Sequence, residues 1–539
     1  MTSTTMSYGV RLMRARIPKV CVAVTGNDGV ELVQKAEALV RDDRLLEFRL
    51  DYLKNPASAL PRIKRFLDFH PEVVVIATCR RAVNGGKFRG SAASELDLLM
   101  KAAAAGCQLV DVELETAESL KTAEMDKLRQ CVAVLLSYHD FKGTKKLDET
   151  FARMKAIPAE FYKVVTTATS LHDNVLMMKF LQTNRDQYSL IGLCMGEQGI
   201  ISRVLGVRAG SVFTFGSSGV GEETAPGQVT ARELRETYRI DMVDAATKVY
   251  GVAGDPVSHS LSPVMMNSAF RRENVNAVYV ALHAKKLTDL LACVQGIPIH
   301  GLSVTMPYKQ DIVSELDNSD QPTQKTGACN TVVRAQDGRL YGFNTDVYGV
   351  VAPLEQRMNL QGASVLVLGA GGAARAAVFG LKARGAEVYI LNRTAATAQK
   401  LARQAQAKTV KRTDLKKQHF DAIINATPLG MGTSKQSPLE EKELKELKAK
   451  YLFDLVYNPL ETRLMKMAQA AGMQVISGVE MFVQQGAHQF EIWTGKPAPV
   501  AEMQYVVNRE LQTRQAQESA GSNGSSSGKA AAKKPAKKK

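Results

Sequence analysis

Short apolar runs of strand length recur between Lys19 and Gly219, and segments with helical periodicity separate them. The runs are K-V-C-V-A-V-T, L-L-E-F-R-L-D, V-V-V-I-A-T-C-R, L-V-D-V-E-L, V-A-V-L-L-S-Y-H, E-F-Y-K-V-V-T-T, S-L-I-G-L-C-M and S-V-F-T-F-G. Apolar runs without alternation are typical of parallel strands that are buried on both faces. About eight such strands over roughly 200 residues predict an α/β fold, namely a (β/α)₈ barrel.

Polar side chains lie late in these runs or in the loops that follow. In a (β/α)₈ barrel the functional groups gather at the carboxyl ends of the strands. The arginines suggest an anionic ligand, while a lysine and a histidine on neighbouring strands suggest imine chemistry with proton transfer. Taken singly, each residue also has a structural explanation, since buried ion pairs often line barrels and a lone histidine is more often structural than catalytic. The candidates are Glu47, Arg49, Arg80, Glu113, His139, Lys163, Arg203 and Gln228.

Lys163 stands inside the strand-forming stretch E-F-Y-K-V-V-T-T-A-T. A lysine in a strand usually lies on a solvated edge or extends its ammonium group to water. The alternative is a desolvated amine that condenses with a carbonyl group. The stretch alone leaves both interpretations open.

Length and composition predict a multidomain globular protein. A chain of 539 residues is too long for one domain, and its 45% hydrophobic and 23% charged residues are those of a globular chain. No apolar run reaches the ~18 residues of a membrane span, so we expect no membrane partner and a cytoplasmic location. Cys21, Cys79, Cys131 and Cys194 fall in apolar runs, which predicts buried free thiols. We expect no metal, because the motifs contain no cluster with ligand spacing.

The two termini differ from the rest of the chain. The N-terminal segment up to Arg16 carries arginines and no acidic residue, so import into a plastid stays open although no apolar signal region follows. The segment 515–539 is rich in Gly, Ser, Ala and Lys, which predicts a disordered basic tail. Its lysines contribute to the net charge of +16, and we expect them to form no specific nucleic-acid site. They are Lys529, Lys533, Lys534, Lys537, Lys538 and Lys539.

Residues 19–243 resemble type I 3-dehydroquinate dehydratase. The resemblance rests on D-V-E-L followed by L-L-S-Y-H-D, and on E-F-R-L-D, T-C-R, Y-K-V-V-T-T-A-T, I-S-R and A-P-G-Q. It implies that Lys163 forms a Schiff base with the substrate ketone and that His139 moves the protons. It also implies that Arg203 holds the substrate carboxylate. The other residues implied in substrate binding are Glu47, Arg49, Arg80, Thr224 and Gln228.

Asn84 is a departure from that family. In T-C-R-R-A-V-N-G-G the family usually has a glutamate at this place, and its carboxylate is thought to orient and tune the histidine. An amide can orient an imidazole by a hydrogen bond, but it cannot stabilise an imidazolium by charge. We therefore expect Asn84 to face His139 and to alter the pH dependence of dehydration.

The second half contains a dinucleotide-binding pattern. S-V-L-V-L-G-A-G-G-A-A-R-A-A-V-F-G-L reads as a strand, a glycine turn and a helix, and the strand A-E-V-Y-I-L-N-R-T follows. Within such a βαβ unit, backbone N–H groups at Gly369, Gly371, Gly372 and Ala373 can meet a pyrophosphate at the helix N-terminus. After the second strand the chain has Asn392, Arg393 and Thr394 instead of an acid. A guanidinium group there favours the 2′-phosphate of NADP.

The region from 248 to about 510 resembles shikimate dehydrogenase. The motifs are V-S-H-S-L-S-P, S-V-T-M-P-Y-K, G-A-C-N-T, G-F-N-T-D, N-A-T-P-L-G-M, D-L-V-Y-N-P and V-Q-Q-G-A-H-Q. The resemblance implies a substrate lobe (248–350), a Rossmann lobe (351–475) and returning C-terminal helices (476–514). It also implies that Lys309 and Asp346 are the catalytic residues. It implies that the substrate-binding residues are Ser260, Ser262, Thr305, Asn330, Tyr457, Gln485 and Gln489. It also implies that Thr427, Met431 and Gly478 are among the cofactor-binding residues.

The two resemblances concern consecutive reactions. Dehydration of 3-dehydroquinate yields 3-dehydroshikimate, which a shikimate dehydrogenase reduces to shikimate with NADPH. We therefore predict a bifunctional lyase and oxidoreductase of the shikimate pathway. Two alternatives stay open, namely a catabolic quinate/shikimate dehydrogenase fusion and a regulatory metabolite-binding protein. Arg393 argues against the first alternative, and the presence of Lys163, His139, Lys309 and Asp346 argues against the second.

Overall fold

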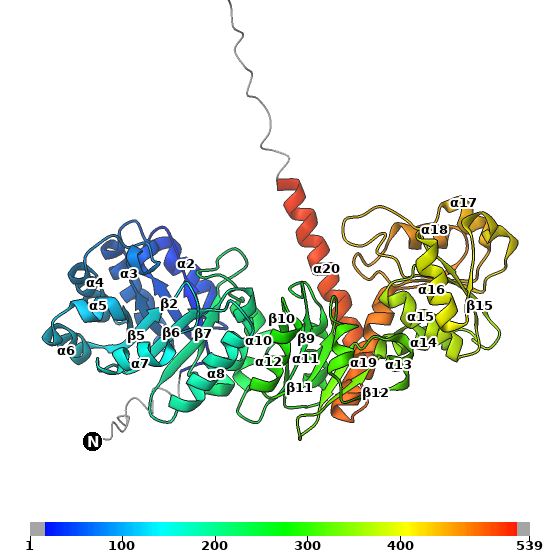
Figure 1. Cartoon of the computed structure of the whole chain (residues 1–539). Coiled ribbons are helices and arrows are strands. Elements are labelled where there is room, and N and C mark those ends of the chain that lie inside the picture. Colours follow the sequence, from blue (N-terminus) through cyan, green and yellow to red (C-terminus); the bar gives the residue numbers. More distant parts are fainter. Residues whose placement is uncertain (1–16, 525–539) are drawn as a thin grey trace, which may run out of the picture. The chain divides into compact units, whose positions relative to one another are not determined.

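The computed structural model describes residues 17–524 of the chain, and side chains up to residue 517 (Figure 1). The chain divides into two compact units. One comprises the residues up to Pro263 together with Asn276–Tyr308, and the other comprises Val264–Val275 together with the residues from Lys309 onward. Each unit is described by itself below. The predicted import segment and the six tail lysines lie outside the described residues.

The first unit contains the predicted barrel. Its parallel strands follow the order β7-β6-β5-β4-β3-β2-β1-β8, and β1 pairs with β8. The backbone N–H of Val212, just before β8, donates to Leu190 O at the start of β7 (2.8 Å), so the two ends of the sheet are adjacent. The prediction of a (β/α)₈ barrel is confirmed. The strands are β1 Val20–Val24, β2 Leu45–Arg49, β3 Val74–Thr78, β4 Leu109–Glu113, β5 Ala133–His139, β6 Phe161–Thr167, β7 Leu190–Met195 and β8 Thr214–Ser217.

Helices connect successive strands of the barrel, as the helical periodicity predicted. Their N-termini are capped by polar side chains at several places, for example by Asp28, whose carboxylate accepts from Val30 N and Glu31 N. The helices are α2 Gly29–Leu39, η1 Leu50–Tyr52, α3 Pro56–Phe69, η2 Ala82–Asn84, α4 Ala92–Ala104, α5 Leu114–Ser119, α6 Thr122–Cys131, α7 Leu147–Lys155, α8 His172–Asn184, η3 Glu197–Gly199, α9 Ile200–Ala209, α10 Ala231–Glu236 and η4 Ile240–Met242.

Apolar side chains fill the barrel interior at its amino-terminal end. The strands contribute to one cluster of buried residues that includes Cys21, Leu45, Ile76, Leu109, Leu135, Phe161, Ile191 and Phe215. Because successive strand residues alternate between inside and outside, the next inward positions lie nearer the carboxyl ends of the strands. Those positions carry the polar residues of the candidate site.

The remainder of the first unit is a small parallel sheet with the order β10-β9-β11. The second unit contributes a further β-structure in which β14 pairs with β12 and with β13. The strands and helices of these parts are β9 Lys248–Gly254, α11 Ser262–Arg272, β10 Ala277–His283, α12 Leu287–Gly296, β11 Ile299–Val304, η5 Asp311–Glu315, β12 Asn318–Ser319, α13 Gln321–Thr326, β13 Thr331–Arg334, β14 Leu340–Phe343 and α14 Thr345–Glu355.

A six-stranded parallel sheet of order β17-β16-β15-β18-β19-β20 forms the rest of the second unit. Numbered along this part of the chain, the order is that of a Rossmann fold, with its switch point between β15 and β18. The Rossmann lobe is therefore confirmed. Its elements are β15 Ser364–Leu368, α15 Gly372–Ala383, β16 Glu387–Leu391, α16 Ala395–Ala405, β17 Lys408–Thr409, η6 Arg412–Lys417, β18 Ala422–Asn425, α17 Glu441–Leu447, β19 Tyr451–Asp454, α18 Arg463–Ala470 and β20 Gln474–Ile476.

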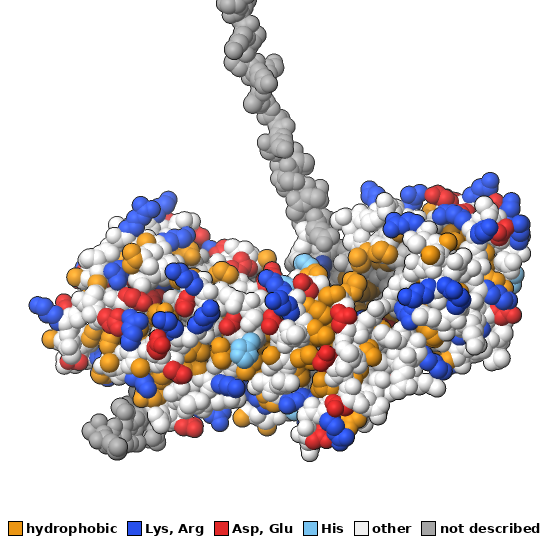
Figure 2. Space-filling view, viewed as in Figure 1, with side chains coloured by type: hydrophobic (Ala, Val, Ile, Leu, Met, Phe, Trp, Pro, Cys, Tyr) orange, Lys and Arg blue, Asp and Glu red, His pale blue; other side chains and the backbone are white. Residues whose placement is uncertain are grey.

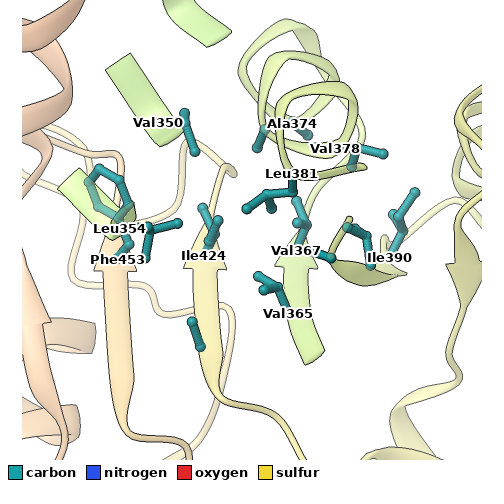
Figure 3. Close-up of a cluster of buried hydrophobic side chains, with 14 of the residues drawn as sticks. Val350, Leu354, Val365, Val367, Ala374, Val378, Leu381, Ile390, Ile424 and Phe453 are labelled. Atoms are coloured by element: carbon teal, nitrogen blue, oxygen red, sulfur yellow. The ribbon is translucent and has the colours of Figure 1, made fainter. Parts of the chain in front are cut away.

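The Rossmann sheet is buried on both faces. Figure 3 shows Val367 of β15 beside Leu381 of α15, and Val365 and Ala374 belong to the same buried cluster. The alternate residues of β15, such as Leu366, belong to a second cluster with side chains of α17 and α18. Two-sided burial explains why these strands are apolar without alternation.

Two C-terminal helices follow, α19 Gly478–Thr494 and α20 Val500–Gly524. Helix α20 continues to Gly524, so the prediction of a disordered tail from residue 515 is wrong up to that residue. The sequence Q-A-Q-E-S-A consists largely of residues that tolerate a helix, and the helix already begins far upstream.

Cys131 also differs from expectation. It is exposed at the end of α6, whereas Cys21, Cys79 and Cys194 are buried as predicted, and all seven thiols are free. The residue ends α6, so the apolar residues that follow it belong to β5 rather than to its own element. Within residues 17–524, no helix is both long and apolar enough to cross a membrane. Figure 2 shows lysines and arginines interspersed with acidic side chains on the visible face, and gathered over the Rossmann lobe.

Candidate active sites

Lys163 is buried in the barrel interior rather than on a solvated strand edge. Only 3% of its surface is exposed, and strands β5 and β7 flank it, with Ser137 and Ile191 as register partners. Its ammonium group donates to Asp111 Oδ2 (2.9 Å), lies 3.6 Å from Glu47 Oε1 and sits 4.1 Å from the centre of the Phe215 ring. The edge interpretation of this lysine is therefore excluded.

A chain of alternating charges leads from Lys163 to His139. Asp111 Oδ2 is shared between Lys163 and Arg80 Nη2 (3.2 Å), and Arg80 Nε contacts Glu113 Oε1. The ring Nδ1 of His139 lies 2.7 Å from the same Glu113 oxygen. These groups come from strands β4, β5 and β6 and from the loop after β3, so neighbouring strands of the barrel bring them together.

The charge network sets the ionisation of its members. Burial opposes ionisation of Asp111, but the charges of Lys163 and Arg80 outweigh it and hold the pKa of Asp111 below its ordinary value. Burial raises the pKa of Glu113 to about 7, with Asp111 adding to the effect and Arg80 opposing it. Burial, and then the charges of Arg80 and Lys163, lower the pKa of His139 well below its ordinary value. His139 is therefore a neutral imidazole near neutral pH, which is the form that can accept a proton.

The other predicted barrel residues make contacts of their own. Glu47 accepts a hydrogen bond from Thr78 Oγ1 (2.8 Å). Arg49 makes a two-point contact with Asp51 through Nε (2.9 Å) and Nη2 (2.8 Å). Burial would lower the pKa of Arg49, but the hydrogen bond to Asp51 outweighs it, so the guanidinium group stays charged.

Arg203 lies in the first turn of α9 and is almost completely buried. Its Nη2 donates to Pro226 O (3.3 Å), while its Nε has no hydrogen-bond partner among the described residues. Burial lowers the pKa of Arg203 to about 10, and the described structure places no carboxylate within ion-pair distance of it. A buried cation with an unused donor is suited to an anionic ligand. In the neighbouring loop, Gln228 Oε1 accepts from Thr224 N (2.7 Å) and Thr224 Oγ1 (3.1 Å).

In the second unit, Lys309 and Asp346 form the predicted pair. Lys309 Nζ lies 2.5 Å from Asp346 Oδ2, and Asn330 Nδ2 donates to Asp346 Oδ1 (2.9 Å). Asp346 stands in the first turn of α14, where the helix dipole favours a negative charge. Asp346 is buried, but Lys309 is only half-buried and can still be reached from outside.

Two glutamines of α19 face the same segment. Gln485 Oε1 accepts weakly from Asn330 Nδ2 (3.4 Å), and Gln489 Nε2 donates to Asn330 O (3.2 Å) and Thr331 Oγ1 (2.9 Å). Tyr457 stacks on Phe482, with ring centres 4.9 Å apart. Ser260, Ser262 and Thr305 belong to the other compact unit, where Ser262 N donates to Ser260 Oγ (3.2 Å).

The glycine turn after β15 has the geometry of a phosphate cradle. Gly369 has φ +110°, and a Cβ there would come within 2.9 Å of Ala426 O after β18, so only glycine fits. A Cβ on Gly371 or Gly372 would meet nothing within 4 Å, so open space lies over the N-terminus of α15. The backbone there, including Ala373, can be approached by a pyrophosphate. These residues fit a dinucleotide.

The other predicted cofactor residues lie along the same edge of the Rossmann sheet. Arg393 is exposed after β16, and its side chain has no hydrogen-bond or ion-pair partner within the described part of the chain; Asn392 Nδ2 donates to Thr394 O (3.0 Å). Thr427 Oγ1 donates to Asn425 Oδ1 (2.7 Å), and Met431 is 58% exposed. Gly478 begins α19, where a Cβ would come within 2.5 Å of Val456 O.

The chain matches four known family descriptions in order. Residues 20–245 match type I 3-dehydroquinase, and residues 252–332 match the substrate-binding domain of shikimate dehydrogenase. Residues 353–475 match shikimate/quinate 5-dehydrogenase, and residues 478–504 match the C-terminal domain of shikimate 5′-dehydrogenase.

A relative from Arabidopsis thaliana, named bifunctional 3-dehydroquinate dehydratase/shikimate dehydrogenase, chloroplastic, is 34% identical over 92% of this chain and 85% of its own length. The chain belongs to this bifunctional family. A shikimate dehydrogenase (NADP(+)) of Oleidesulfovibrio alaskensis is 39% identical over 48% of this chain and 94% of its own length. A crystal structure of shikimate 5-dehydrogenase from Thermus thermophilus with NADP(H) and shikimate is 34% identical, covers 49% of this chain and 99% of that chain, and has a TM-score of 0.46.

Within this bifunctional chain, one expectation about the dehydratase half is wrong. Asn84 does not partner His139, because Asn84 Nδ2 donates to Glu115 Oε2 (3.2 Å) while His139 Nδ1 lies 2.7 Å from Glu113 Oε1. Asn84 lies in the short turn η2, where spacing does not reveal the direction of a side chain. The carboxylate beside His139 therefore comes from strand β4.

Sequence reasoning also missed Asp111, which no motif argument had assigned to the site. The information was present, because residues i and i+2 of a strand point to the same side. In D-V-E-L, Glu113 was a candidate, so Asp111 had to face the same interior. Ser137 was missed as well, although its hydroxyl donates to Asp111 Oδ1 (2.6 Å).

Proposed function

We propose that the barrel dehydrates 3-dehydroquinate to 3-dehydroshikimate through an imine on Lys163. The amine attacks the substrate ketone, and loss of water leaves a protonated imine. An iminium withdraws electrons from the neighbouring C–H bond far better than a ketone does. The bond therefore becomes acidic enough for an imidazole to break it.

His139 is the base in this scheme. It takes the proton from the carbon next to the imine and returns a proton to the departing hydroxyl group, which leaves as water. Hydrolysis of the imine then releases 3-dehydroshikimate and restores the amine. The low pKa of His139 keeps the ring neutral before each turnover. The contact with Glu113 supports this role, because a carboxylate stabilises the imidazolium that forms.

Arg203 is the proposed partner of the substrate carboxylate, since it is buried, charged and has an unused Nε donor. Glu47, Arg80, Thr224 and Gln228 are proposed to bind the hydroxyl groups. Arg49 is proposed to orient the substrate from its fixed contact with Asp51.

In the second half, Lys309 and Asp346 are proposed to reduce 3-dehydroshikimate to shikimate. The carbonyl oxygen becomes an alkoxide, and Lys309 supplies the proton while its positive charge stabilises the oxygen. Asp346 fixes the ammonium group, and Asn330 fixes Asp346. Ser260, Ser262 and Thr305 are proposed for the substrate carboxylate, and Tyr457, Gln485 and Gln489 for its other polar groups.

NADPH supplies the hydride when it is bound. Gly369, Gly371, Gly372 and Ala373 would hold its pyrophosphate, and Arg393 would hold its 2′-phosphate, with Asn392 and Thr394 beside it. Thr427, Met431 and Gly478 would line the nicotinamide side. The free, exposed guanidinium of Arg393 supports NADP over NAD, because a second phosphate would satisfy it.

The buried connection from Lys163 through Asp111, Arg80 and Glu113 to His139 carries this proposal for the dehydratase half. It also opposes the alternative of a regulatory binding protein, because binding alone does not require a buried amine beside a neutral imidazole. The substrates are small molecules, and we propose no specific nucleic-acid or membrane partner. We place the enzyme in the cytoplasm, with a plastid as the alternative because the Arabidopsis relative is named chloroplastic.

A coupled assay with 3-dehydroquinate and NADPH tests the proposal. Enone absorbance should rise as 3-dehydroshikimate forms, and it should fall as NADPH is oxidised, with one cofactor consumed for each substrate. NADPH oxidation from added 3-dehydroshikimate but not from 3-dehydroquinate would refute the dehydratase half. Enone accumulation without NADPH oxidation would refute the reductase half.

A further inference from the structure

Arg375 stands at the start of the helix that follows the glycine turn, and no motif assigned it a role. It lies in the first turn of α15, and its backbone N–H donates to Gly371 O (2.9 Å). Its side chain leaves the helix, because Nε donates to Thr326 O (2.9 Å) and Nη1 donates to Gln404 Oε1 (2.9 Å). One guanidinium group therefore joins three elements.

The acceptor at Thr326 belongs to the segment that leads to the proton-donating pair. Thr326 ends α13, and Gly327 caps that helix with φ +63°. Asn344, which caps the helix carrying Asp346, donates to Thr326 Oγ1 (2.9 Å) and Ala328 O (2.8 Å). The same segment runs on to Asn330, which holds Asp346. These hydrogen bonds therefore couple the position of Thr326 to the position of the Lys309–Asp346 pair.

The acceptor at Gln404 belongs to another helix of the Rossmann lobe. Gln404 is the next-to-last residue of α16, the helix whose start at Ala395 follows Arg393 and Thr394. Arg375 itself follows the open glycine turn. The guanidinium plane therefore links the pyrophosphate helix, the helix after the 2′-phosphate segment and the segment that holds Asn330.

These contacts are not an ordinary ion pair. Both acceptors are neutral, and the described residues place no carboxylate within ion-pair distance of Arg375. Arginine suits this position because its planar group holds two acceptors at fixed angles, whereas a lysine is a single point of charge. The contacts therefore fix geometry more than they add Coulombic stability.

We propose that Arg375 is a positioning residue of the reductase, which fixes the orientation of the Rossmann lobe against the segment carrying Asn330. The proposal rests on the proposed reductase function. Hydride transfer requires the reacting atoms to lie about 3–3.5 Å apart, and a misplacement of about 1 Å costs roughly 100-fold in rate. Cofactor binding to the Rossmann lobe alone does not need this orientation.

Arg375→Ala in the full-length chain is the test. The kcat for reduction of 3-dehydroshikimate should fall about 10- to 100-fold, while the Kd of NADPH measured without substrate should change less than about twofold. The isotope effect with NADPH deuterated at the transferred position should rise, because hydride transfer becomes slower than the other steps. Arg375→Lys should be intermediate, since one of the two acceptors can still be reached.

Arg384→Ala is the matched control. Arg384 caps the other end of α15 and pairs with Glu355 Oε1 at the surface (2.7 Å), so its loss should leave kcat unchanged. A lower melting temperature of Arg375→Ala with unchanged kcat would assign a purely structural role and overturn the inference. A rise in the NADPH Kd that accounts for the whole loss would also overturn it. If the wild-type chain fails to reduce 3-dehydroshikimate, the proposed function itself is wrong.

Discussion

The barrel site and the reductase site carry out related chemistry, but they use different side chains and different degrees of burial. Both must stabilise charge on a former carbonyl and move a proton. The barrel does so with a buried network on rigid strands, in which Lys163, Asp111 and His139 are almost inaccessible. The reductase uses a half-buried lysine and one carboxylate at a helix start. The barrel must itself supply the electron sink, whereas in the reductase a bound cofactor drives the chemistry and the protein provides a proton and alignment.

This contrast predicts that the barrel depends most on a single residue. Lys163→Ala should lower dehydratase kcat on the order of 10⁴-fold or more, because no other amine of the network can form the imine. Reduction of 3-dehydroshikimate should be unchanged. Borohydride added during turnover should trap an adduct at Lys163 in the wild type, which mass spectrometry of the peptides can locate. Lys101→Ala, which breaks a surface pair with Asp97, is the control. Undiminished adduct in Lys163→Ala would contradict the assignment.

A smaller loss is expected at the proton donor of the reductase. Lys309→Ala should lower reductase kcat about 10²- to 10⁴-fold, the usual range for loss of a general acid. The dehydratase rate should stay constant, since Lys309 belongs to another compact unit. Lys408→Ala, which removes an exposed lysine paired with Glu387, is the control. Steady-state rates of both reactions check the prediction, and equal losses in both halves would contradict it.

The cofactor preference should respond to one exposed side chain. Arg393→Ala should raise the KM for NADPH about 10- to 100-fold, which corresponds to the ~1.5–3 kcal/mol of a charged hydrogen bond. The KM for NADH should change little, because NADH lacks the phosphate. Arg412→Ala, which breaks a surface pair with Glu443, should affect neither cofactor. Parallel losses for both cofactors would place Arg393 elsewhere in the mechanism.

The smallest effect should appear in the pH profile of the barrel. The pKa of Glu113 is raised to about 7, so its carboxylate forms as the pH rises through that value. Because the carboxylate stabilises the imidazolium of His139, dehydratase kcat should rise through about pH 7. Glu113→Gln should lower kcat roughly 10-fold, which corresponds to the ~1.4 kcal/mol that is a tenfold rate change, and it should remove the inflection. Asn84→Glu should leave the inflection in place, since Asn84 contacts Glu115. A shifted inflection in Asn84→Glu would show that residue 84 faces His139 after all.

The same pKa predicts a trend in stability. An unfolded glutamate titrates near ~4.3, so between that pH and about 7 the folded chain binds more protons at Glu113 than the unfolded chain. Stability from this group is therefore lost as the pH rises across the window. Thermal unfolding of the barrel should show this slope, and Glu113→Gln should flatten it.

The sequence predicted the parts that repeat a physical pattern. The barrel strands were found because they are buried on both faces, and the Rossmann lobe because a glycine turn stood between a strand and a helix. Lys163 was recognised as a candidate, but its burial was not decided by its own stretch, since the partners Asp111 and Glu47 come from other strands.

The failures concern side-chain direction and helix ends. Asn84 was placed beside His139, but it lies in a short turn whose side chains follow no simple period. The end of α20 was placed too early, because Gly and Ser near the tail suggested disorder while the preceding residues support a helix. The direction of the Asn84 side chain does not follow from local composition, because it depends on the partner Glu115 that the fold brings near it.

Mixing the two single variants Lys163→Ala and Lys309→Ala tests most directly that one chain holds two independent sites for consecutive reactions. The measurement is shikimate formed from 3-dehydroquinate and NADPH. Each variant alone should form it at least about 100-fold more slowly than the wild type, and the mixture should restore formation because 3-dehydroshikimate released by one variant is reduced by the other. A rate close to that of the wild type with either variant alone, or no rise in the rate on mixing, would contradict the account.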